Sequence, residues 1–198
     1  LFDIRGVAGT NALSTLNEAS NIHAHFVSDG TSDWSDYELR GRLYVASTGG
    51  GVGVTIFSDY TNSDAYYRLR RKASAGEAFE LSAHPDANAT LVCNAPSTGV
   101  VPAAAAWYVF RLRAVDVGSS SVVEAKVWRQ GQSEPAGWQA RCEDVGSRRR
   151  ASGHIGVWSM GVGLKAWDDL EVVPVGNIPT PTAQPLEPPT LIDVVPVE

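Results

Sequence analysis

Arginine and tyrosine recur at alternate positions in three stretches of this chain. The guanidinium group of arginine binds a carboxylate through two parallel hydrogen bonds, and an aromatic ring offers a flat face on which a sugar ring stacks. In a β-strand, alternate side chains share one face. If the polar faces of the three stretches form one surface, that surface is a basic and aromatic groove suited to an acidic or neutral glycan. The candidate ligand-binding residues are Arg40, Arg42, Tyr44, Tyr66, Arg68, Arg70, Arg111 and Arg113.

The same alternation has a second interpretation, in which the arginines pair with glutamates on neighbouring strands. Glu38, Glu80 and Glu124 lie in β-prone stretches and could serve as partners. Opposite charges on adjacent strands stabilise an exposed sheet face without binding anything else. The sequence leaves both interpretations open, because alternation alone does not identify the neighbouring strands.

Catalytic groups are disfavoured by the sequence. A glycosidase needs two carboxylates that face each other across a cleft, about 5 to 10 Å apart. Asp168 and Asp169 are adjacent, so in a strand we predict that they point to opposite faces. A polysaccharide lyase needs a tyrosine or histidine base beside a group that neutralises a uronate. We therefore predict no catalytic residues and expect that the protein is not an enzyme.

Metal ligands form no recognisable motif. His23 and His25 share a strand face at a spacing that could hold a metal, but no third ligand accompanies them, so we expect a polar role at the end of a strand. Aspartates offer hard oxygen ligands for calcium, yet they lack the spacing of an EF-hand. We predict no cofactor, and a structural Ca²⁺ ion is an open alternative. The aspartates concerned are Asp29, Asp33, Asp36, Asp59, Asp64, Asp168 and Asp169.

The two cysteines, Cys93 and Cys142, belong to no CxxC motif, which argues against a zinc site. Each is predicted to lie in a loop. One disulfide between them would close a loop of about fifty residues, as in an exported protein. The alternative is two free thiols in the cytosol. An acidic chain rich in Trp, Gly, Ser and Thr, with a Pro/Thr tail, favours a secreted or cell-surface location.

Regular short stretches of alternating apolar and polar residues, separated by Gly, Ser, Asn and Asp, predict about nine strands in residues 1–173. Two packed antiparallel sheets accommodate that number of strands in one domain. The run of alanines at 103–106 is too short to hold a helix alone. The predicted strands are 22–27, 37–45, 52–57, 65–71, 77–82, 107–115, 122–129, 154–160 and 165–173.

Composition excludes several classes of protein. The chain has 198 residues and a net charge of −6, the wrong sign for a protein that mainly binds nucleic acid. No apolar run approaches the roughly 20 residues that span a bilayer. The chain begins at Leu1 with neither Met nor a signal peptide, as expected for a processed or excised piece.

The C-terminal segment differs from the rest of the chain, because residues 174–198 hold seven of the eleven prolines and no Lys, Arg or aromatic residue. Residues 174–190 are predicted to be a stiff polyproline-type linker. Residues 191–198 form a short β-prone run, either a tethered strand or the start of a further segment. A tethered strand could complete a sheet edge of a neighbouring copy. The candidate assembly residues are Leu191, Ile192, Val194, Val195 and Val197.

Several motifs resemble the concanavalin A-like lectin/glucanase superfamily, and in particular the laminin-G-like jelly-roll modules of bacterial secreted proteins. The resemblance covers roughly residues 2–173 and implies an all-β, antiparallel two-sheet jelly-roll sandwich. The glucanase motif Glu-x-Asp-x-x-Glu and the lyase motif Arg-x-Glu-Leu-Arg are both absent. The motifs include Asp33-Trp34-Ser35-Asp36-Tyr37-Glu38, Ala125-Lys126-Val127-Trp128, Glu134-Pro135-Ala136-Gly137-Trp138-Gln139, Gly156-Val157-Trp158-Ser159-Met160-Gly161 and Trp167-Asp168-Asp169-Leu170.

These observations favour a non-catalytic extracellular module that recognises a glycan or a cell-surface polysaccharide, with a role in adhesion. A first alternative is a structural subunit of an extracellular filament or surface assembly, in which the C-terminal strand binds the next copy. A second alternative is a polysaccharide lyase or glycosidase.

Overall fold

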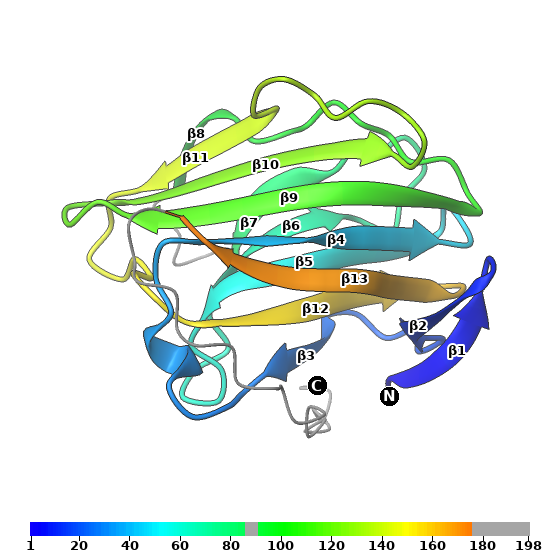
Figure 1. Ribbon diagram of the computed structural model, residues 1–198, viewed down its shortest axis with the longest axis horizontal. Coiled ribbons are helices and arrows are strands. Elements are labelled where there is room, and N and C mark those ends of the chain that lie inside the picture. The colour runs from blue at the N-terminus through cyan, green and yellow to red at the C-terminus, as the bar shows by residue number, and fades with distance from the viewer. Residues whose placement is uncertain (86–90, 176–198) are drawn as a thin grey trace.

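The protein is an all-β, antiparallel jelly-roll sandwich of two sheets, as the sequence predicts (Figure 1). The computed structural model describes residues 1–85 and 91–175. The eight-stranded sheet, sheet A, lies in front of the five-stranded sheet, sheet B, in Figure 1. In spatial order, sheet A consists of β1 (Asp3–Val7), β2 (Thr10–Thr15), β13 (Lys165–Pro174), β4 (Tyr37–Val45), β9 (Ala106–Asp116), β10 (Ser121–Arg129), β11 (Ala140–Asp144) and β8 (Leu91–Ala95). Sheet B consists of β3 (Ile22–Phe26), β12 (His154–Gly161), β5 (Gly50–Ser58), β6 (Tyr66–Arg71) and β7 (Glu80–His84), and a 3₁₀ turn, η1, covers Thr31–Asp33.

Nine of these strands match the nine predicted ones, β4 with the predicted ends and the others with ends shifted by up to three residues, and the prediction missed four. The largest shift is in β7, which begins at Glu80 rather than at residue 77. The missed strands β1, β2, β8 and β11 have five or six residues each and form the two outermost strands at each end of sheet A. No helix forms in the alanine run, because Ala105 has a positive φ of 54° and Ala106 begins β9.

The hydrophobic core fills the space between the two sheets. Leu39 and Leu43 of β4 and Phe110 of β9 contribute from sheet A, and Val54 and Leu69 contribute from sheet B. Each apolar side chain of this size stabilises the fold by about 1.5 to 3 kcal/mol when fully buried.

Hydrogen bonds to the backbone also join the sheets. The Nε1 of Trp167 in β13 donates to the carbonyl of Gly53 in β5 at 2.8 Å. The hydroxyl of Tyr37 in β4 donates to the carbonyl of Gly153 at 2.8 Å and accepts from the amide of Phe57 at 3.1 Å. These bonds fix how sheet A lies on sheet B, and so fix the position of the loops at the sheet ends.

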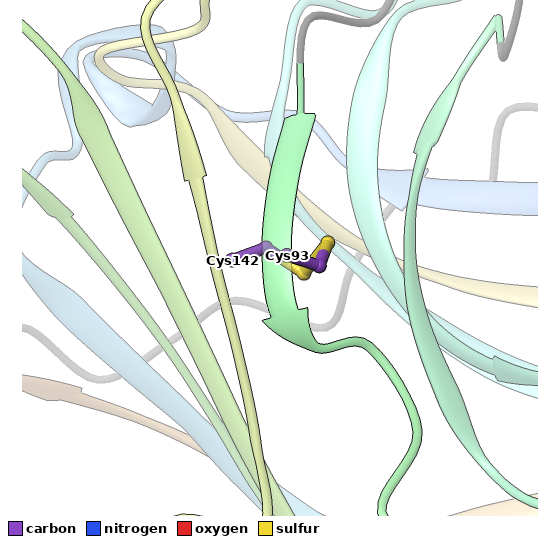
Figure 2. The surroundings of a disulfide bond; sticks show 2 residues. All are labelled: Cys93 and Cys142. Carbon is purple, nitrogen blue, oxygen red and sulfur yellow. A yellow bond between two sulfur atoms is a disulfide. The ribbon is translucent and has the colours of Figure 1, made fainter.

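The predicted disulfide between Cys93 and Cys142 is present (Figure 2). The loop prediction for the two cysteines was wrong, since Cys93 lies in β8 and Cys142 lies directly opposite it in β11. Facing positions on antiparallel strands bring two Cα atoms close together, and these are 4.1 Å apart. The bond ties the edge strand β8 to sheet A.

Within the residues that the structure describes, no helix is long and apolar enough to cross a membrane. Of the predicted linker, residues 176–190 lie outside the described residues, and so does the whole candidate assembly strand, 191–198. Pro174, the first residue of the predicted linker, is instead the last residue of β13.

Candidate functional site

The structure divides the eight candidate ligand-binding residues between two surfaces. Arg40, Arg42 and Tyr44 lie in β4, and Arg111 and Arg113 lie in the neighbouring strand β9 of sheet A. Tyr66, Arg68 and Arg70 lie in β6, a strand of sheet B. Alternation predicts the face of each strand, but it does not predict to which sheet a strand belongs. The eight residues therefore do not form the single groove that the sequence suggested.

On the outer face of sheet A, a row of cations crosses three strands. Arg40 of β4 lies opposite Arg111 of β9, and Arg111 lies opposite Lys126 of β10. Like charges in facing positions repel one another, so the row requires carboxylates between its members. Glu38 fills the first gap, with its Oε1 2.5 Å from Arg40 Nε and its Oε2 2.8 Å from Arg111 Nη2.

Glu38 and Glu124 are the fixed carboxylates of this face, and the ion-pair ladders considered in the sequence are present. Only 3% of the Glu38 side chain is exposed. Burial opposes its ionisation, but the hydrogen bonds and charges of Arg111 and Arg40 outweigh burial and lower the pKa of Glu38 below its usual value. Glu124 pairs in the same way with Arg113 and with Arg141.

A different carboxylate arrangement surrounds Arg42. The prediction that Asp168 and Asp169 point to opposite faces was wrong, since both contact Arg42, at 2.6 Å and 3.0 Å. The register of β13 against β4 shifts between Asp168 and Glu171, and Asp169 has a positive φ of 54°. A bulge of this kind breaks the alternation on which the prediction depended.

On the outer face of sheet B, two histidines contact one carboxylate, and a third histidine contacts one of the two. His84 Nε2 lies 3.0 Å from Asp64 Oδ2, and His23 Nε2 lies 3.3 Å from Asp64 Oδ1. His25 Nε2 lies 3.0 Å from His23 Nδ1, so one of these two ring nitrogens donates a hydrogen bond to the other. Burial opposes ionisation of Asp64, but His23 and His84 outweigh it and hold the pKa of the carboxyl well below its usual range.

Asn21 organises the middle of the same face. Its Oδ1 accepts hydrogen bonds from Trp158 Nε1 at 2.8 Å and from the Tyr66 hydroxyl at 3.1 Å. The guanidinium of Arg68 lies over the Trp158 ring at 5.1 Å. Tyr66 is 1% exposed and Arg68 is 2% exposed, so these two candidate residues are packed into the face instead of standing out from it.

A cavity of about 390 Å³ lies beside Asp64 and His84, lined by residues of β6, of β7, of the adjoining loops and of the end of β11. We call it the sheet B pocket. The Tyr66 ring stacks on His84 at 4.9 Å and forms part of its wall. The Tyr67 hydroxyl donates to Asp144 at 2.7 Å and accepts from the amide of Arg150, which links three further lining residues. Its lining residues are Ser63, Asp64, Ala65, Tyr66, Tyr67, Ala83, His84, Pro85, Asp144, Arg148 and Arg150.

The pocket presents one charged hydrogen-bond acceptor, Asp64, and one protonated phenol, Tyr66. A carboxylate held by two histidines accepts hydrogen bonds from hydroxyl groups, and 38% of the Asp64 side chain is exposed. Burial raises the pKa of Tyr66 well above its usual value, so its phenol stays protonated at neutral pH. Within residues 1–85 and 91–175, no three His, Cys, Asp or Glu side chains are grouped so that they could hold a metal ion.

Acid is expected to destabilise the fold through His25. Burial and the neighbouring His23 lower the pKa of His25 from 6.5 to about 3. The unfolded imidazole therefore binds a proton between these pH values while the folded one does not. Stability is full above pH 6.5 and falls as the pH falls, by about 2 kcal/mol between pH 7 and pH 5.

Denaturant unfolding at pH 7 and pH 5 measures this loss. The His25→Gln variant removes the titrating group, so it should lose about 2 kcal/mol less than the wild type over the same interval. Equal losses in the two proteins would show that His25 is not the acid-sensitive group.

Sequence reasoning identified His23 and His25 as a pair but did not connect them with Asp64 or His84. Asp64 follows β5 in a loop and His84 ends β7, so their meeting depends on the order of strands in sheet B. Sequence reasoning did not identify Asn21, because a single asparagine before a strand belongs to no functional motif.

No model of a known protein family matches the chain, and no curated protein sequence matches it. Among solved structures, the carbohydrate-binding module CBM66 from Bacillus subtilis is similar over 81% of this chain and 85% of its own, at 9% identity and a TM-score of 0.45. A heptameric SAP-like pentraxin from Limulus polyphemus (80% and 71% covered, 11% identity, TM-score 0.28) and peanut lectin (86% and 90% covered, 10% identity, TM-score 0.27) are more distant. We draw no function from likeness at this level.

Proposed function

We propose that this chain is a non-catalytic extracellular module that binds a glycan in the sheet B pocket. The observation that carries the proposal is the arrangement of Asp64, which is held by His23 and His84 and lines a cavity of about 390 Å³. A cavity of this size lies within the range of small-ligand sites. A carboxylate fixed before the ligand arrives loses little side-chain entropy on binding sugar hydroxyls.

Two further features support the absence of catalysis. The pKa of Asp64 is lowered, so its carboxyl is a poor proton donor to a glycosidic oxygen. The pKa of Tyr66 is raised, so its phenol is a poor base for the abstraction of a sugar proton. The disulfide between Cys93 and Cys142 supports an oxidising, extracellular location, either secreted or on the cell surface.

Screening of the wild-type chain on a glycan array tests the proposal. For a bound glycan, Asp64→Asn should weaken binding by about 10 to 100 fold, because hydrogen bonds to a charged acceptor contribute about 1.5 to 3 kcal/mol. Asp29→Asn is the matched control, since Asp29 is an exposed aspartate that lies outside the pocket. Its affinity should equal that of the wild type, and equal thermal midpoints establish that the variants fold.

Two outcomes would overturn this function. One is the absence of binding to any glycan, or an Asp64→Asn variant that binds as well as the wild type. The other is the release of new reducing ends or unsaturated sugars from an incubated polysaccharide, which would make the protein a hydrolase or a lyase.

A second candidate function is self-assembly through the C-terminal strand, and an open sheet edge favours it. Within the described residues, β1 is an edge strand of sheet A, and Ile4 in β1 is 66% exposed. An exposed edge can accept a strand from a neighbouring copy. Deletion of residues 177–198 should then reduce the particle size measured by light scattering, and an unchanged size would exclude this function.

A further inference from the structure

The loop of residues 130–139 joins β10 to β11 (Figure 1). Two of its side chains contact the row of cations on the outer face of sheet A. Glu134 pairs with Arg111 and Lys126, and the Trp138 ring lies within cation–π distance of both. The sequence prediction included Arg111 among the ligand-binding residues but did not include the loop that contacts it.

Glu134 fills the second gap in the row of cations. A single oxygen, Oε1, lies 2.7 Å from Arg111 Nη1 and 2.5 Å from Lys126 Nζ. The Lys126 side chain is only 9% exposed, so its ammonium group is aimed into this gap and not into solvent. The hydrogen bond from Lys126 is the main cause of the lowered pKa of Glu134, so the group in the gap is a carboxylate at neutral pH.

The two carboxylates of the row differ in how firmly they are held. Glu38 belongs to β4 and is 3% exposed, whereas Glu134 belongs to a loop and is 39% exposed. Within the described residues, Glu134 is the carboxylate partner of Lys126, so its departure leaves two facing cations, Arg111 and Lys126, without an anion between them. Facing like charges repel, and this repulsion favours the entry of another anion.

Trp138 adds an aromatic wall to the gap. Its ring lies 5.2 Å from Lys126 Nζ, 5.8 Å from Arg111 Cζ and 4.6 Å from Arg113 Cζ. A ligand that enters therefore meets a pair of cations beside an indole. A carboxylate attached to a ring fits this arrangement, because the cations bind its charge and the indole contacts its ring.

We propose that Arg111, Lys126 and Trp138 form a second binding site, which takes the carboxylate of a uronic acid residue in an acidic polysaccharide, and that Glu134 occupies this site in the free protein. The site lies on sheet A, so it is separate from the sheet B pocket and goes beyond the function proposed for that pocket. Displacement of Glu134 by the ligand exchanges one carboxylate for another, and no covalent bond is made or broken.

Titration of the protein with polygalacturonate tests this site. Isothermal titration calorimetry at low salt measures the binding. The Glu134→Gln variant removes the internal competitor and should bind about tenfold more tightly than the wild type. Addition of Lys126→Met to that variant should abolish the gain. Neutral dextran should bind neither protein at this site, and dextran sulfate shows whether a sulfate replaces the carboxylate.

Controls separate this site from a general charge effect and from the pocket. Asp29→Asn changes the net charge by the same amount as Glu134→Gln, so an equal gain in affinity would overturn the proposal. Unchanged or weaker binding by Glu134→Gln would also overturn it, as would binding of dextran sulfate that does not depend on Lys126. Asp64→Asn should leave polygalacturonate binding intact, so a failure of the pocket and a failure of this site give different results.

Discussion

Replacement of both Cys93 and Cys142 by alanine is expected to lower the free energy of unfolding by about 4 kcal/mol. The two cysteines are 49 residues apart in sequence, so their bond removes a large loop-closure entropy from the unfolded chain. The bond also holds β8, which lies at the edge of sheet A and pairs with β11 alone within the described residues. Denaturant unfolding of the variant and of the wild type measures the difference.

The wild-type protein unfolded in the presence of a reducing agent is the control for this change. Cys142 is 1% exposed, so alanine also removes buried sulfur, whereas reduction keeps both sulfur atoms in place. A loss of similar size in the reduced protein assigns the effect to the covalent bond. A stable reduced protein beside an unstable double variant would assign the effect to packing.

Strand positions could be predicted from the sequence because a half-buried strand has apolar and polar residues at alternate positions. The stretch 37–45 is an example, since Tyr37, Leu39, Leu43 and Val45 are all in the core of the structure. The edge strands β1 and β8 escaped prediction because an edge buries little. Only one of the five residues of β1 is buried, so no apolar period remains to be found.

The candidate sites could be predicted only in part, because each depends on which strands are neighbours. The cation row on sheet A unites β4, β9 and β10, and its first two strands were predicted to act together. Its third cation, Lys126, and the loop carboxylate Glu134 were not assigned to it. The Asp64 cluster brings together residues of a loop, of β3 and of β7, and no local sequence pattern predicts contacts between such distant segments.

The Glu38→Gln variant is expected to lose about 3 kcal/mol of stability, which is the lower end of the range for breaking a buried ion pair. Glu38 is 3% exposed and contacts both Arg40 and Arg111, so the neutral amide leaves two cations facing each other across β4 and β9. Partial exposure of the two arginines, 38% and 26%, lets solvent screen part of their repulsion.

Glu134→Gln provides the comparison that separates a structural carboxylate from an exchangeable one. Both variants remove one negative charge beside Arg111, but Glu134 is 39% exposed and lies in a loop, so its loss should lower stability by less than about 1 kcal/mol. Thermal unfolding of the two variants at equal salt measures the contrast. A large loss with Glu134→Gln would mean that the second gap in the cation row needs its own carboxylate for folding, and the chain could not then release Glu134 to admit a ligand. A small loss of stability with Glu38→Gln would instead mean that solvent alone screens the charges of the cation row. Glu38 and Glu134 would then not differ as a fixed and a replaceable carboxylate.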